Sequence, residues 1–291
     1  MDERERPDER FEEHRTHLRA VAYRMLGSMS DADDAVQETW LRLNRADTTD
    51  VQNLGAWLTT VVSRICLNVL RSREHRREEP LDAHTPGPPP DHENDPEQEA
   101  VLADSVGLAL LVVLDTLTPA ERLAFVLHDM FAVPFDEIGP LIERSAPAAR
   151  QLASRARRRV KGAPAPDADL PRHRRVVDAF LAATRGGDFS ALVTLLHPDV
   201  VLRADKSVVP TPSSIFISGA GTVAKSAMAA MGRARLAGPA LINGTVGLAM
   251  APRGRLALVL SFTIIDDQIT EIDVIADPDR LDRLDLAVLP D

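Results

Sequence analysis

Hydrophobic side chains recur at steps of three and four residues through the first half of the chain, a spacing that predicts amphipathic helices. The first helix is expected over residues 11–26, and Gly27 follows as a stop signal. The second is expected over residues 31–43, with Ser30 as its N-cap and Asp33 close to a capping-box position. A polar loop and then a long third helix, over 54–73, complete this group.

The second helix has one apolar face and one polar face. Its polar face carries Asp34, Gln37, Glu38 and Arg42, for which an ordinary solvated surface is the alternative to a binding surface. The third helix exposes three arginines, and together they form a basic patch: Arg64, Arg71 and Arg73.

A second helical group begins with the apolar stretch 106–117. Thr118 followed by Pro119 and Glu121 is a strong helix start, because it combines an N-cap, a first-position proline and a capping box. A short helix over 135–142, a turn over 143–145 and a basic helix then form a helix-turn-helix pattern.

The basic helix, residues 144–161, holds seven basic residues and no acidic residue in a chain of net charge -10. Ser145 is its expected N-cap. Guanidinium and amide groups on such a helix can reach phosphates and base edges in the major groove, although a solvated basic helix is the alternative. The candidate DNA-contacting residues of this helix are Ser145, Arg150, Gln151, Ser154, Arg155 and Arg158.

The pattern changes after residue 172. Helices are expected over 175–185, 189–196 and 223–235, strands over 200–203 and 215–218, and β-rich segments over 241–250, 256–265 and 269–275. The last two segments are joined by a hairpin signal at 266–268. Helices followed by an antiparallel sheet predict an α+β domain.

Two polar segments divide the chain of 291 residues into domains. Residues 78–99 are acidic and proline-rich, and residues 162–171 form a shorter linker. The expected organisation is therefore an all-α domain at 8–77, an all-α helix-turn-helix domain at 100–161 and an α+β domain at 172–291.

Composition narrows the classes of function. The single cysteine, Cys66, excludes an internal disulfide, and no apolar run is long enough for a membrane span, so we expect a cytoplasmic protein. No cysteine pair or His-x3-His spacing indicates a metal, and we expect no cofactor. His197 and Asp199 are the acid–base candidates, but Leu-His-Pro-Asp-Val also suits a plain turn between helix and strand.

Motifs in two regions of the chain carry a family resemblance. Residues 30–43, Ser-Asp-Ala-Asp-Asp-Ala-Val-Gln-Glu-Thr-Trp-Leu-Arg-Leu, resemble region 2 of the bacterial sigma-70 family. Leu-Thr-Pro-Ala-Glu-Arg at 117–122, Phe-Asp-Glu-Ile-Gly at 135–139 and the arginine-rich run at 150–159 resemble region 4. Two such regions with a short linker are the layout of extracytoplasmic-function (ECF) sigma factors.

The resemblance implies partners and roles. The polar face of the second helix would bind the clamp helices of the largest subunit of core RNA polymerase. The loop 44–53 and the following helix would capture the promoter −10 element, with Arg64, Arg71 and Arg73 supplying charge. The basic helix would read the −35 element. No catalysis is needed for these roles.

The third domain resembles the SnoaL-like cone on Phe-Leu-Ala-Ala-Thr-Arg-Gly-Gly-Asp-Phe at 180–189, on 195–205 and on Asp-Pro-Asp-Arg-Leu at 277–281. A subgroup of ECF sigma factors carries this domain at the C-terminus, where it regulates the sigma factor in cis. Its apolar strands would enclose a pocket that can take a small ligand.

These observations favour an alternative sigma factor, without enzymatic activity, that directs core polymerase to promoters. Two alternatives stay open. One is a SnoaL-like enzyme or ligand sensor fused to a helix-turn-helix regulator, and the other is a helix-turn-helix repressor or activator that works without polymerase contact.

Overall fold

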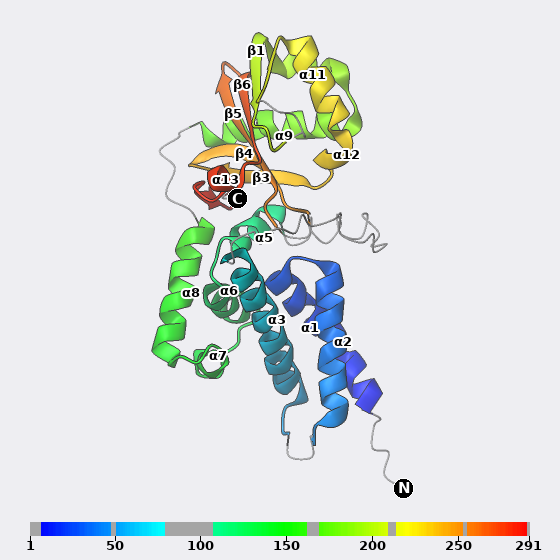
Figure 1. Ribbon diagram of the computed structural model, residues 1–291, viewed down its shortest axis with the longest axis vertical. Coiled ribbons are helices and arrows are strands. Elements are labelled where there is room, and N and C mark those ends of the chain that lie inside the picture. The colour runs from blue at the N-terminus through cyan, green and yellow to red at the C-terminus, as the bar shows by residue number, and fades with distance from the viewer. Residues whose placement is uncertain are drawn as a thin grey trace. The chain divides into compact units, whose positions relative to one another are not determined.

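The computed structural model describes residues 7–47, 51–78, 107–161, 169–208, 214–252 and 255–289. The predicted linker at 78–99 lies outside the described residues from residue 79 onward, as does most of the linker at 162–171. The chain forms two compact units, Met1–Glu99 with Leu117–Arg157 and Ala100–Thr116 with Arg158–Asp291. Figure 1 shows their helices and strands.

Three helices form the first part of unit 1. They are α1 (Pro7–Leu26), α2 (Met29–Arg45) and α3 (Leu54–Glu78), and each packs on the other two. The predicted N-cap at Ser30 is wrong. Gly27, at a φ of 72°, ends α1, and the extended Ser28 accepts a hydrogen bond from the Asp31 N–H. Since α2 begins at Met29, Ser30 is already helical and cannot cap.

The second part of unit 1 begins at the predicted capping box. Thr118 and Glu121 exchange hydrogen bonds at the start of α6 (Pro119–Phe125), as the sequence indicates. A π-helical turn, η1 (Val126–Met130), continues α6, and α7 (Phe135–Leu141) and α8 (Ala146–Lys161) follow.

Cys66 lies on the buried side of α3, and its side chain is not exposed to solvent. Burial raises the pKa of its thiol to about 12, so the group stays protonated and unreactive at neutral pH. This agrees with a structural, apolar role for the side chain.

Unit 2 contains a seven-stranded sheet in the order β2-β1-β6-β5-β4-β3-β7. Its strands are β1 (Leu196–Ala204), β2 (Ile215–Ser218), β3 (Ala237–Ile242), β4 (Thr245–Met250), β5 (Leu258–Ile265), β6 (Gln268–Ile275) and β7 (Leu286–Ala287). Its helices from residue 170 onward are α9 (Leu170–Gly186), α10 (Phe189–Leu195), α11 (Ala220–Ala229), α12 (Met231–Ala234) and α13 (Pro278–Leu281).

The sheet differs from the expectation in one way: it is mixed rather than antiparallel, because β1 pairs with β6 in parallel. The β-rich segment expected over 241–250 forms most of a hairpin of β3 and β4, turned by Asn243 and Gly244 with φ values of 50° and 83°. Asn-Gly is a strong signal for a two-residue hairpin, and its left-handed backbone suits glycine. The predicted hairpin at 266–268 is confirmed.

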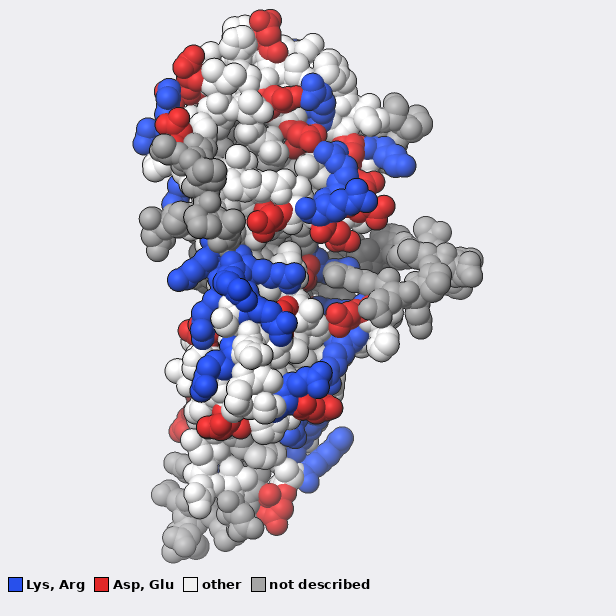
Figure 2. Space-filling model, turned by 90° about the vertical axis from the view of Figure 1, so that its left-hand side faces the viewer, with Lys and Arg blue, Asp and Glu red and all other residues white. Residues whose placement is uncertain are grey.

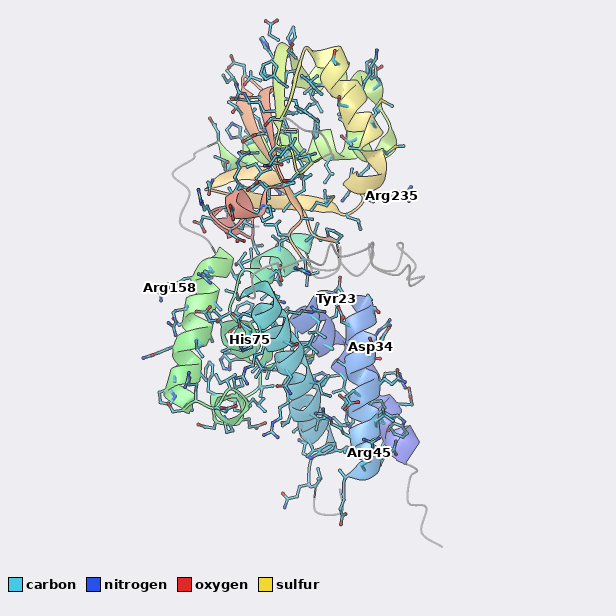
Figure 3. All side chains as sticks on the ribbon, viewed as in Figure 1. Tyr23, Asp34, Arg45, His75, Arg158 and Arg235 are labelled. Atoms are coloured by element: carbon cyan, nitrogen blue, oxygen red, sulfur yellow. The ribbon has the colours of Figure 1, made fainter. Side chains whose placement is uncertain are left out.

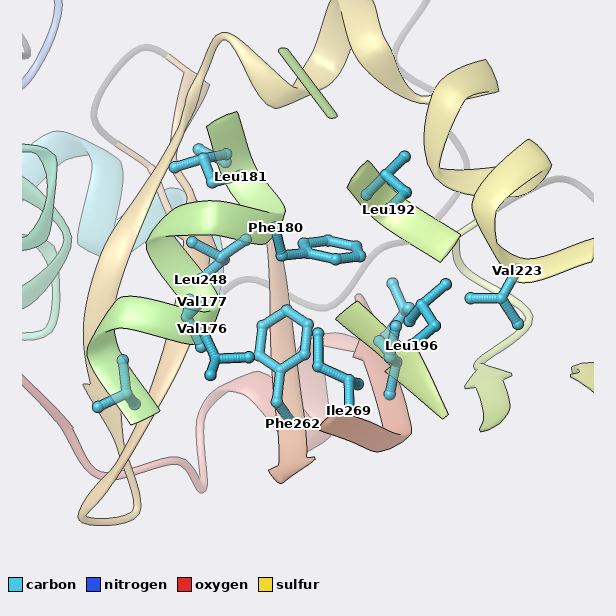
Figure 4. Packing of buried hydrophobic residues seen from close by; sticks show 14 of the residues in the cluster. Val176, Val177, Phe180, Leu181, Leu192, Leu196, Val223, Leu248, Phe262 and Ile269 are labelled. Atoms are coloured by element: carbon cyan, nitrogen blue, oxygen red, sulfur yellow. The ribbon is translucent and has the colours of Figure 1, made fainter. Parts of the chain in front are cut away.

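In the main core of unit 2, helices α9, α10 and α11 pack against the sheet. Phe180 of α9 meets Phe262 of β5 with ring centroids 5.3 Å apart, and Figure 4 shows aliphatic side chains around this pair. Burial of these apolar surfaces is the main force that holds the helices on the sheet.

A further helix, α5 (Leu108–Asp115), belongs to unit 2. The sequence predicts this segment in the helix-turn-helix domain at 100–161, most of which lies in unit 1. Ala109, Val112 and Val113 pack into a second apolar cluster with residues of β3, β4 and β5. The backbone of β3 approaches α5 closely, because a Cβ added at Gly238 would lie 3.0 Å from the Cβ of Leu108.

The carboxylate of Asp205 joins the end of β1 to the segment after β6. It accepts hydrogen bonds from the N–H groups of Ala276 and Asp277, each at 2.8 Å, and from Ser207 at 3.1 Å. Burial by itself would raise the pKa of this carboxyl group, but these donors and the guanidinium of Arg280 outweigh burial, so the pKa lies below its usual value.

We expect Asp205→Asn to lower the free energy of unfolding of unit 2 by about 1–3 kcal/mol at neutral pH, because buried N–H groups lose their charged acceptor. A lowered folded-state pKa stabilises the fold above the unfolded-state pKa, so the difference should shrink as the pH falls below about 4. Urea denaturation across this range measures it, with the exposed Asp199→Asn as control. A difference that does not change with pH would contradict the assignment.

Candidate nucleic-acid interface

Helix α8 presents a basic face over an alanine-lined inner face. Ala149, Ala153 and Ala156 are completely buried, which allows close packing of the helix on unit 1. Ser145 caps the helix as predicted, since its hydroxyl accepts a hydrogen bond from the Ala148 N–H at 3.4 Å. Figure 2 shows blue side chains gathered over the face that carries α8.

The predicted side chains of α8 fall into two groups. Arg150 lies over the ring of Phe135 at 5.3 Å, and Arg155 pairs with Glu121 at 3.7 Å. In contrast, Gln151, Ser154 and Arg158 are exposed and have no hydrogen bond or ion pair within the part of the chain that the structure describes. Figure 3 labels Arg158 near the end of the helix. The second group is therefore free to bind a ligand such as DNA.

The turn before α8 depends on two unusual backbone positions. Glu143 adopts a φ of 56°, the left-handed conformation for which glycine is common. Gly139, inside α7, accepts hydrogen bonds from the N–H groups of Ile142 and Arg144. A Cβ added at Gly139 would lie 2.8 Å from the carbonyl oxygen of Arg144, so the close approach of α7 to the turn requires glycine there. Sequence patterns do not predict this role, although Gly139 ends the motif at 135–139.

The three arginines predicted on α3 differ in their surroundings. Arg64 is exposed. Arg71 is exposed and lies 3.7 Å from the carboxylate of Glu143. Arg73 is the least accessible, with its side chain 27% exposed, and it pairs with Asp31 at 2.7 Å. The structure thus brings Arg71 close to the helix-turn-helix, and it engages Arg73 in an internal ion pair.

Two arginines occupy the C-terminal end of α1, a role that the sequence did not reveal. Arg122 of α6 is 3% exposed, and its Nη1 donates to the carbonyl oxygen of Met25 at 2.8 Å. Nη1 of Arg73 lies 3.4 Å from the carbonyl oxygen of Leu26. The last carbonyls of a helix lack partners within it and carry partial negative charge, so these cations stabilise the helix end.

The polar face of α2 is accessible. Asp34, Gln37 and Arg42 are exposed, and Glu38 pairs with Arg42 at 3.0 Å. Their spacing places them on one side of the helix, opposite the buried Ala32, Ala35, Val36 and Leu43. Figure 3 labels Asp34 on α2.

A cavity of about 370 Å³ lies in unit 1 beside the start of α3. Asn53 and Thr59 line it from the α3 side, and Phe131 and Glu137 line it from η1 and α7. Asn53 also caps α3, since its Oδ1 accepts a hydrogen bond from the Ala56 N–H at 3.0 Å. The cavity therefore combines polar groups with an aromatic ring, which suits a planar base with hydrogen-bonding edges.

The acid–base candidates of the third domain lie within β1, so the predicted turn between helix and strand is wrong. Nδ1 of His197 accepts a hydrogen bond from the Asp199 N–H at 3.2 Å. Pro198 and Asp199 are exposed, and the pairing of β1 with β6 shifts register in this segment. Within the described residues, neither His197 nor Asp199 lines the cavity of this domain.

No helix among the described residues is long and apolar enough to cross a membrane.

Two family models match the parts of the chain that carry these surfaces. Residues 10–76 match the family model described as Sigma-70 region 2, and residues 107–160 match that described as Sigma-70, region 4. The chain is 39% identical over 297 residues to the ECF RNA polymerase sigma factor SigJ of Mycobacterium tuberculosis, covering 93% of this chain and 91% of the relative.

Two further comparisons cover similar lengths. The probable ECF RNA polymerase sigma factor SigI of Mycobacterium tuberculosis is 36% identical over 276 residues, with 93% of each chain covered. The crystal structure of the Mycobacterium tuberculosis ECF sigma factor SigJ has 35% sequence identity and a TM-score of 0.45, covering 94% of this chain and 97% of that chain. Both matched family models are sigma-70 regions, and neither is a catalytic family.

Proposed function

The chain belongs to the ECF RNA polymerase sigma factors. From this we propose which of its surfaces bind RNA polymerase and which bind promoter DNA in promoter-specific transcription initiation. Helix α8 reads the −35 element. The observation that carries this assignment is the exposed, internally unpaired set of Gln151, Ser154 and Arg158 on a capped helix of a helix-turn-helix. Ser145, Arg150 and Arg155 support it from the turn and the flanks of the helix.

The polar face of α2 binds the clamp helices of the largest polymerase subunit through Asp34, Gln37, Glu38 and Arg42. The support is their exposure on one side of a helix whose other side is buried. Residues 44–53, of which Asn44 and Arg45 extend α2 and 48–50 lie outside the described residues, capture the −10 element together with the start of α3. The cavity beside Asn53 supports this role, and Arg64, Arg71 and Arg73 attract the single-stranded backbone.

The C-terminal domain regulates the sigma factor in cis and does not act as an enzyme. Two observations support this. Helix α5 lies within the sequence matched to region 4 but packs on the C-terminal sheet, and His197 and Asp199 lie in β1 and are not among the described residues that line the cavity. The protein would act in the cytoplasm, where RNA polymerase works.

In vitro transcription tests the main assignment. Purified core polymerase, the full-length protein and templates from a promoter library should give initiation from a defined class of promoters, and the protein should co-purify with core polymerase. Failure of both would contradict a sigma function. Binding to DNA with repression, and no dependence on polymerase contact, would instead support a helix-turn-helix repressor.

Base-reading and phosphate-binding roles on α8 can be separated. We expect Gln151→Ala to cost about 1–3 kcal/mol at one promoter position and to relax specificity there. Arg158→Gln should weaken binding to all sequences alike and reduce the salt slope by about 1. Promoter-binding titrations over a range of salt concentrations measure both. Equal losses of specificity in the two variants would contradict the division of roles.

Regulation in cis can be tested at the close approach of β3 and α5. In Gly238→Val, the added side chain meets Leu108, while a β-branched residue suits the strand, so we expect α5 to dock less tightly and the sheet to persist. Hydrogen exchange of residues 108–115 should rise, and transcription with core polymerase should change by about threefold or more, since differences of about 1 kcal/mol are expected from such contacts. Faster exchange with unchanged transcription would contradict regulation through α5.

A further inference from the structure

The C-terminal domain encloses an apolar cavity of about 290 Å³. Its walls come from α9, α11, α12 and six strands, and none of the described residues that line it is charged. Hydrophobic side chains that include Leu202, Ile217, Leu248, Met250 and Leu260 cover most of the surface. The cavity is at the lower end of the size range for small-molecule sites in proteins.

Among the described lining residues, Thr184 and Ser226 carry hydroxyl groups, and both hydroxyls already donate hydrogen bonds within the protein. Thr184 donates to the carbonyl oxygen of Phe180 at 2.8 Å, and Ser226 donates to that of Thr222 at 3.1 Å. A charged or strongly hydrogen-bonding ligand would lose its hydration here without compensation. An uncharged apolar ligand would gain about 25 cal/mol for each Å² of surface that it buries.

The strands that line the cavity also hold α5 on their other face. Successive side chains of a strand point to opposite faces. Leu248 and Leu260 line the cavity, whereas Ala249 and Val259 pack in the cluster that contains Val113 of α5. A ligand that moves β4 or β5 therefore changes the surface on which α5 rests. Of the residues labelled in Figure 4, Phe180, Leu181 and Leu248 line the cavity.

We propose that this cavity is an effector site for a small, uncharged hydrophobic molecule, and that β4 and β5 transmit its occupation to α5. The cavity and the packing of α5 on the other face of β4 and β5 stand independently of promoter recognition. The effect on transcription rests on the proposed sigma function, because α5 belongs to the sequence matched to region 4.

A pair of fluorescent probes tests the ligand class in the full-length protein. N-phenyl-1-naphthylamine is uncharged, and 1-anilinonaphthalene-8-sulfonate is a similar molecule with a negative charge. We expect the uncharged probe to bind with a stoichiometry of one and at least about tenfold more tightly than the sulfonate, because the cavity offers no partner for the charge. Equal binding of the two probes would overturn the ligand class.

Two variants of α11 test the position of the site. Ala227 lines the cavity, so Ala227→Phe should fill it and weaken binding of the uncharged probe by about tenfold or more, equal to about 1.4 kcal/mol. Thr222 is exposed and outside the cavity lining, so Thr222→Phe adds the same side chain without this effect. Undiminished binding by Ala227→Phe would overturn the site. If this variant does not fold, Ala230→Leu fills the same cavity with a smaller side chain.

Hydrogen exchange of residues 108–115 tests transmission to α5. Saturation with the uncharged probe should change the exchange rate of these amides in the wild type and in Thr222→Phe. No change at saturation would overturn the transmission. Neither measurement uses polymerase or promoter DNA, so failure of the proposed sigma function would be seen separately, in the transcription assay.

Discussion

Gly139→Ala is expected to destabilise unit 1 and to weaken promoter binding by α8. The new methyl group would lie 2.8 Å from the Arg144 carbonyl oxygen and 3.2 Å from the Ala146 nitrogen, and both are backbone atoms. Overpacking of this kind costs about 1–3 kcal/mol, and rigid neighbours favour the upper end. Alanine regains about 1 kcal/mol through its helix propensity. The steric clash must exceed this gain for the substitution to lower the free energy of unfolding.

The net result should be a loss of about 1–2 kcal/mol in the free energy of unfolding, measured by urea denaturation. Because the turn must open, α8 should also lose part of its contact with a −35 element, which lowers promoter affinity by roughly tenfold. Gly221→Ala is the matched control, since Gly221 lies in α11 with no atom near its added Cβ. Wild-type stability and affinity in Gly139→Ala would show that the turn does not need glycine.

Arg122→Met is expected to lower the free energy of unfolding of unit 1 by about 2–3 kcal/mol, through loss of a buried charge-assisted hydrogen bond. Methionine retains most of the apolar stem but leaves the carbonyl of Met25 without this donor. The contact joins residues 97 positions apart, so its loss should also loosen the packing of α6 on α1.

Urea denaturation and hydrogen exchange at the end of α1 measure this effect. Arg19→Met is the control, because Arg19 makes an exposed ion pair with Asp33 that contributes less than about 1 kcal/mol. A loss in Arg122→Met no larger than that of the control would mean that the end of α1 is stabilised by other groups.

Much of the candidate site follows from local patterns. The basic helix, its cap at Ser145 and the polar face of α2 depend on residues within a few positions of one another. The same holds for the capping box at Thr118 and Glu121. The N-cap at Ser30 was wrong by two residues, because the place where α1 ends and α2 begins is decided by the backbone at Gly27.

Other parts of the site were beyond sequence reasoning. Arg73 follows the same pattern as Arg64, yet it pairs with Asp31 and caps α1. The hairpin inside the β-rich segment 241–250 was within reach of the sequence, because Asn243-Gly244 signals a two-residue turn. Apolar periodicity indicates that a face is buried, but it does not say which element covers that face.

The sequence by itself determined the helical character of the sigma regions, the β-rich C-terminal domain and the chemistry of α8, because these depend on short-range patterns of charge, apolar spacing and caps. The tertiary structure decided that α5 packs on the C-terminal sheet, that β1 runs parallel to β6 and that an apolar cavity lies on the opposite face from α5. These features arise from contacts between segments far apart in the chain, and their relative stability depends on how well complementary surfaces pack in three dimensions.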